Sequence, residues 1–68
     1  MALAKIFPQK LKQARTSKKL TQTALAAKAG IGVSYVSMLE RGQRSPPLDT
    51  LEALAKALGV QPTSLLEA

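Results

Sequence analysis

A chain of 68 residues is near the lower limit at which one hydrophobic core suffices without disulfides or metals. It has no cysteine and no histidine, which excludes disulfides and thiolate metal sites and removes the commonest general base. Only four Asp and Glu residues are present, so the composition argues against an enzyme, and we expect no catalytic residue, no metal, no cofactor and no small-molecule ligand.

The positive charge is concentrated in the first part of the chain. Residues 1–48 contain nine Lys and Arg residues and one acid, Glu40, whereas residues 49–68 contain one Lys and three acids. This asymmetry favours a polyanionic partner, although a generally soluble basic protein would also explain the charge. No apolar run approaches the ~20 residues of a membrane span, and the start is too short for a signal-peptide core. We therefore expect a cytoplasmic protein that does not contact a membrane.

Five short helices are predicted, so the expected fold class is all-α. The first should open at Pro8, because proline suits the first helical position, and fade around residues 17–19. The second should cover residues 22–29, with Thr21 as its N-cap and Gly30 at its end.

The remaining three helices follow from similar signals. The third is predicted from Val33 to about Arg41, before Gly42. A polar loop with two prolines comes next, and residues 48–58 then carry leucines at the spacing of a buried face. A last turn or two is expected over residues 63–67. With no internal repeat and no strand-like alternation, the expected organisation is a single domain over residues 1–68.

The connection between the second and third helices is very short. Gly30 comes nine residues after Thr21, the apolar Ile31 follows, and the next helix begins at Val33. Two helices joined so briefly cannot lie antiparallel and must cross at a steep angle, as in a helix-turn-helix, here about residues 21–41. An ordinary helical corner of another small bundle is the alternative that spacing alone leaves open.

The sequence from the end of the first helix onward resembles the Cro and phage-repressor type of helix-turn-helix protein, the XRE family. The resemblance covers about residues 8–67. Residues 34–42 are also similar to the restriction-modification controller proteins, which are short members of this family. The matching residues are Leu20-Thr21-Gln22, Leu25-Ala26, Gly30, Val36-Ser37, Leu39-Glu40-Arg41-Gly42, Pro46, Leu48, Leu51 and Leu54-Ala55-Lys56-Ala57-Leu58-Gly59-Val60.

The resemblance implies a lambda-repressor-like domain whose helix 33–39 lies in the major groove of double-stranded DNA. It also implies two sets of contacts. The residues that would face base edges are Val33, Ser34, Tyr35, Ser37 and Met38. The residues that would meet the DNA backbone are Thr21, Gln22, Lys28, Gln43, Arg44 and Ser45.

The implied base-reading set has unusual chemistry for its role. It contains no Arg, Lys, Asn or Gln, which are the side chains that pair with guanine or adenine through two hydrogen bonds. Affinity should therefore come mainly from phosphates, and specificity from thymine methyl groups and DNA shape. A position facing the protein core is the alternative for Val33, Tyr35 and Met38; the helical spacing favours exposure of Tyr35 and Met38.

Two further features are implied by the resemblance. A structural ion pair is expected between Arg15 and Glu40, tying the first helix to the third. A homodimer is expected because one recognition helix with few base contacts discriminates weakly. Val60, Leu65 and Leu66 would either form the dimer contact or simply close the core.

The function expected from the sequence is a sequence-specific transcriptional regulator, a repressor acting as a homodimer on double-stranded DNA. The alternative is a protein-interaction module, antitoxin-like or partner-binding, on the same scaffold with weak or non-specific DNA binding. The apolar recognition helix favours the alternative, whereas Gln22, Arg44 and the basic first part of the chain favour the regulator.

Overall fold

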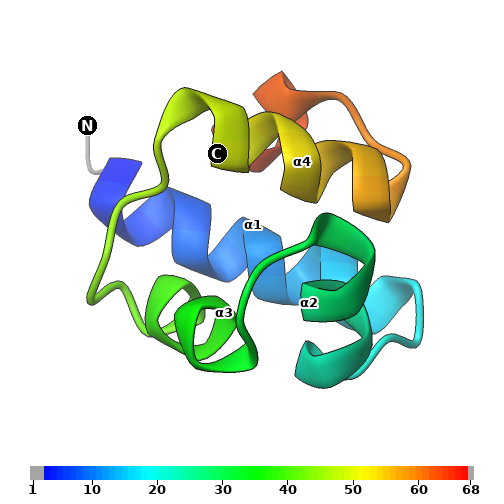
Figure 1. Cartoon of the computed structure of the whole chain (residues 1–68). Coiled ribbons are helices and arrows are strands. Elements are labelled where there is room, and N and C mark those ends of the chain that lie inside the picture. Colours follow the sequence, from blue (N-terminus) through cyan, green and yellow to red (C-terminus); the bar gives the residue numbers. More distant parts are fainter. Residues whose placement is uncertain (1–2, 68) are drawn as a thin grey trace.

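The computed structural model describes residues 3–67, which form four α-helices, one short 3-10 helix and no strand (Figure 1). This part of the chain is therefore all-helical, as predicted, but with four α-helices rather than five. The elements in chain order are α1 (Leu3–Ser17), α2 (Gln22–Ala29), α3 (Val33–Glu40), α4 (Leu48–Leu58) and η1 (Pro62–Leu65).

The predicted start of α1 was wrong. The helix begins at Leu3, and Pro8 lies inside it rather than at its first position. Proline removes one backbone N–H donor there, which normally weakens a helix. Phe7 and Leu11 lie one turn apart and are both buried in the core, so tertiary packing holds the turn that the proline weakens.

The predicted bounds of α2 and α4 are confirmed, and the ends of α2 show why local signals were sufficient. The Thr21 hydroxyl accepts a hydrogen bond from the Ala24 N–H at 3.0 Å, which satisfies one free donor of the first turn. Gly30 ends the helix with a φ of 72°, a left-handed conformation that costs glycine little. Ile31 then donates its N–H to the Ala26 carbonyl at 3.0 Å and packs against the core.

Replacing Thr21 by alanine should lower the free energy of unfolding by about 1 kcal/mol, because the Ala24 N–H loses its partner. Urea unfolding followed by circular dichroism measures this loss. Thr23→Ala is the matched control, since Thr23 is exposed inside the same helix and alanine is a good helix former. Equal losses from the two variants would contradict the capping role.

The fifth predicted helix is a 3-10 helix of four residues. Gly59 has a φ of 69° and ends α4, and Pro62 opens η1 only three residues later. Ser64 donates its N–H to the Gln61 carbonyl, three residues back, at 3.0 Å. The segment is too short for a cooperative α-helix, so the tighter 3-10 bonding replaces it.

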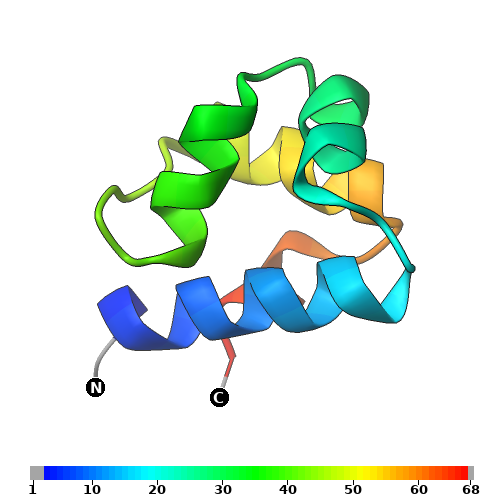
Figure 2. The same ribbon diagram turned by 90° about the horizontal axis from the view of Figure 1, so that it is seen from below.

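Among the residues whose burial the structure describes, 5–67, eleven hydrophobic residues are buried in the core, and all five elements contribute to it. Figure 2 shows α2 and α3 side by side with α1 running beneath them. None of the described helices combines the length and the apolar character of a bilayer span. The buried residues are Phe7, Leu11, Leu25, Ala26, Val36, Leu39, Leu51, Leu54, Ala55, Leu58 and Leu65.

Candidate nucleic-acid interface

A shallow, open groove lies between the start of α2 and the outer face of α3. Helix α3 divides its residues between two faces, since Val36 and Leu39 are buried in the core while Val33 is 44% exposed. The outer residues share the groove with a residue from the first turn of α2 and one from the end of α3. The residues that line it are Gln22, Val33, Ser34, Ser37, Met38 and Arg41.

Four of the five residues predicted to read bases line this groove, and Tyr35 does not. Tyr35 is half-buried and packs against the core. Met38 is also half-buried, although it lines the groove. The exposure expected for these two side chains was therefore overestimated, and for Tyr35 the reason is its packing against the core.

Arg41 is a groove residue that the sequence did not predict. It is exposed and follows the last residue of α3, and the sequence predicts only that the helix ends near it. Its guanidinium provides donors that fit a phosphate or the O6 and N7 atoms of guanine. The signal that could have found it is its spacing, three and four residues after Met38 and Ser37, which places all three on one helical face.

A polar network lies directly behind the groove and joins three helices. Arg15 of α1 donates from Nε to Glu40 Oε2 at 2.6 Å and from Nη2 to Glu40 Oε1 at 3.1 Å. Arg15 Nη1 also donates to the Leu20 carbonyl at 2.8 Å. Gln22 Nε2 donates to Glu40 Oε1 at 3.0 Å. Only 4% of the Glu40 side chain and 12% of the Arg15 side chain are exposed.

The residues predicted to meet the DNA backbone lie in three places. Thr21 and Gln22 are at the start of α2, next to the groove. Gln43, Arg44 and Ser45 are exposed in the loop after α3. Lys28 lies in the last turn of α2 and lines a different shallow hollow with three residues of α4.

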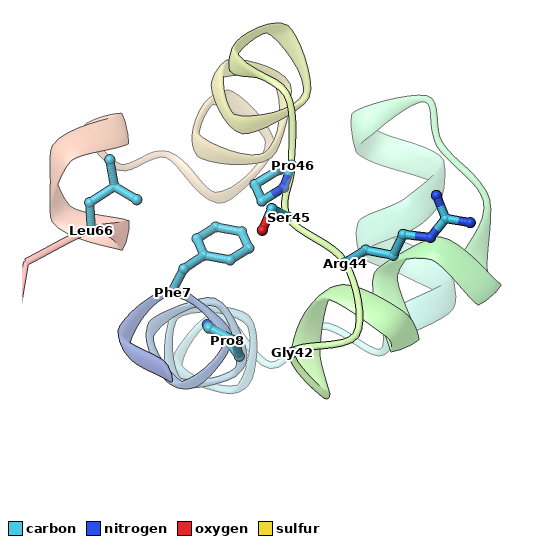
Figure 3. A pocket seen from close by; sticks show the side chains of 7 residues that line it. All are labelled: Phe7, Pro8, Gly42, Arg44, Ser45, Pro46 and Leu66. Atoms are coloured by element: carbon cyan, nitrogen blue, oxygen red, sulfur yellow. The ribbon is translucent and has the colours of Figure 1, made fainter. Parts of the chain in front are cut away.

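A second hollow, of about 220 Å³, lies between α1, the loop after α3 and the end of the chain. Its walls are mostly apolar and include Phe7, Pro46 and Leu66, whereas Arg44 extends its guanidinium away from Phe7 (Figure 3). Of the three residues predicted as a dimer contact or as core, Leu65 is 1% exposed and belongs to the core of a single copy. Val60 and Leu66 are only partly buried.

Comparison with known proteins assigns this architecture to a family. Residues 11–65, from the middle of α1 to the end of η1, match a family described as helix-turn-helix. The chain belongs to the helix-turn-helix family. Within the matched residues, the short turn at Gly30 joins α2 to α3, and the groove described above lies between these two helices.

Two known proteins are similar in sequence to most of the chain. The control protein C.BamHI of Bacillus amyloliquefaciens is 44% identical over 91% of this chain and 78% of its own length. The immunity repressor protein of Bacillus phage phi105 is 45% identical over 85% of this chain, which spans only 40% of that repressor.

Two solved structures have a fold similar to that of this chain. The restriction-modification controller protein C.AhdI of Aeromonas hydrophila has a TM-score of 0.90 at 42% identity, covering 96% of this chain and 98% of its own. The hypothetical transcription factor NHTF from Neisseria has a TM-score of 0.92 at 32% identity, over 96% of this chain and 75% of its own. The helix-turn-helix fold of this chain is therefore also that of the controller protein C.AhdI.

Proposed function

We propose that this chain is a transcriptional regulator, not an enzyme, that binds double-stranded DNA and represses transcription as a homodimer. In this proposal residues 1–68 act as one helix-turn-helix domain, and residues 33–39 of α3 enter the major groove. The observation that carries the proposal is the groove of α2 and α3, whose only charged lining residue is Arg41 and whose other side chains are apolar or uncharged polar.

The charges around the groove support DNA as the partner. Glu40, the one acid of the first 48 residues, is buried against Arg15, so it presents little negative charge at this surface. Arg41 and Arg44 are both exposed just after the C-terminal end of α3. The free N–H groups at the start of α2 add partial positive charge beside Gln22, where a phosphate is favoured.

A second copy of the chain is proposed as the other partner. Two recognition helices about 34 Å apart double the number of base contacts, which a helix without bidentate side chains needs. The partly exposed Leu66 lies in the apolar hollow with Phe7 and Pro46, and Leu48 nearby in the sequence is 72% exposed. Covering the exposed surface of Leu66 and Leu48 would contribute favourably to the association of two copies.

The salt dependence of DNA binding tests the proposal. The chain should bind the DNA upstream of its own gene more tightly than a scrambled duplex of equal length. The logarithm of its affinity should fall by about 0.9 per neutralised phosphate for each log unit of salt. In a dimer Arg44→Ala should remove two phosphate contacts and make this slope shallower by about 1.8.

Lys12→Ala is the matched control for charge, because Lys12 is exposed on α1 and is not one of the residues predicted to meet DNA. It should leave the slope nearly unchanged. Absence of binding to both duplexes at low salt would contradict the proposal and favour the alternative, a protein-interaction module, which the 44% exposed Val33 supports. Sedimentation of the same samples separates a monomer from a dimer.

A further inference from the structure

Val33 presents an exposed apolar side chain at the start of α3. It is the first residue of the helix, it lines the groove and it is 44% exposed, whereas Val36, three residues later, is fully buried. An aliphatic side chain neither donates nor accepts a hydrogen bond, so Val33 gains nothing from a phosphate. It gains free energy only by covering another apolar group and removing both from water.

The major groove of DNA offers one kind of apolar group to such a side chain. Every base pair presents hydrogen-bond donors and acceptors there, and the C5-methyl group of thymine is the one apolar substituent. Cytosine has a hydrogen at the same position of its ring, and methylation at C5 gives it the same methyl group. A side chain that covers this methyl group therefore distinguishes a methylated pyrimidine from an unmethylated one.

The polar groups of α3 beside Val33 do not distinguish thymine from 5-methylcytosine. In the major groove the two bases differ at C4, where thymine has the O4 acceptor and cytosine has the N4 amino donor. Ser34 and Ser37 line the groove with Val33, and a hydroxyl group donates or accepts according to how it rotates. Arg41, which could select one base, follows the last residue of α3, about 12 Å along the helix axis from Val33.

We propose that Val33 reads the C5-methyl group of a pyrimidine in each half-site, so that 5-methylcytosine substitutes for thymine there and cytosine methylation strengthens binding. The inference rests on the proposed function, because it requires α3 to lie in the major groove. It extends that function, since the methylation of the DNA then sets the affinity together with its sequence. Removing one methyl group from water in each half-site corresponds to about fourfold in affinity, or about 15-fold for two half-sites.

Modified duplexes test the proposal with the wild-type chain alone. A binding site is first selected from random duplexes, and each thymine of a half-site is then replaced in turn by uracil, which lacks only the C5-methyl group. One of these replacements should weaken binding about fourfold, and the same replacement in both half-sites about 15-fold. With cytosine and guanine paired at that position, methylation of the cytosine at C5 should strengthen binding by the same factors.

Val33→Ala assigns the effect of the methyl group to this side chain. The variant should fold, because Val33 is exposed and lies outside the buried core. It should bring the affinity ratios of thymine to uracil and of 5-methylcytosine to cytosine close to one. Leu48→Ala is the matched control, since Leu48 is also a large exposed apolar residue but lies on α4 and does not line the groove. It should keep both ratios, whatever it does to the association of two copies.

The possible failures are distinguishable from one another. A wild-type chain that enriches no sequence would overturn the proposed function itself. If the chain enriches a site but uracil replaces every thymine without loss of affinity, the proposed function stands and this inference is wrong. If the effect of the methyl group persists unchanged in Val33→Ala, another residue reads it and the role of Val33 is wrong.

Discussion

Replacing Arg15 by alanine should lower the free energy of unfolding by about 3 to 5 kcal/mol, because it leaves Glu40 buried without its cationic partner. Gln22 alone would then donate to the carboxylate, and the Leu20 carbonyl would lose the donor that Arg15 provides. A chain of this size has a total stability on the order of 3 to 10 kcal/mol, so a large fraction of the variant should be unfolded. The melting temperature should fall by roughly 4 to 8 °C for each kcal/mol of unfolding free energy that is lost.

Two variants separate the ion pair from a general effect of charge. Lys12→Ala removes the same charge from an exposed position of the same helix and should change stability by about 0.5 kcal/mol or less. Arg15→Lys keeps the charge but cannot reproduce the two parallel hydrogen bonds, so its loss should be intermediate. Equal losses from Arg15→Ala and Lys12→Ala would mean that the ion pair contributes nothing specific.

Truncating Leu54 to alanine should cost about 2 to 5 kcal/mol, since its side chain is fully buried and its removal leaves a cavity. Leu48→Ala removes the same atoms from the first residue of α4. Because Leu48 is 72% exposed, this control should change stability by about 0.5 kcal/mol or less at concentrations where the chain is monomeric. Urea unfolding of the two variants gives the comparison. Similar losses of unfolding free energy in the two variants would contradict the placement of α4, which buries Leu54 and exposes Leu48.

Parts of the fold that depend on neighbouring residues could be predicted from the sequence. The bounds of α2 follow from Thr21 and Gly30, and the end of α4 follows from Gly59, because caps act within one turn. The start of α1 could not be predicted, because the local signal of Pro8 is overridden by the burial of Phe7 in the core. That burial depends on elements distant in the chain.

The candidate interface was predictable by position but not by orientation. Val33, Ser34, Ser37 and Met38, which helical spacing and the family resemblance placed on one face, line one groove. The same reasoning did not place Tyr35 against the core or Arg41 beside the groove. The hydrogen bond of Gln22 joins residues 18 positions apart in the sequence. No local pattern reveals such a contact, and yet it decides which atoms of Gln22 a ligand meets.

The two faces of α3 have a consequence for how such a protein can diversify. Its anchoring groups, Val36, Leu39 and Glu40, all lie on the inner side, whereas Val33 and Ser34 are exposed and take no part in the core. Substitutions on the outer side therefore change what is bound at little cost to folding. A duplicated gene could acquire a new operator through a few substitutions on the outer side of α3. A designed protein could likewise carry different residues on that side while it keeps Val36, Leu39 and Glu40.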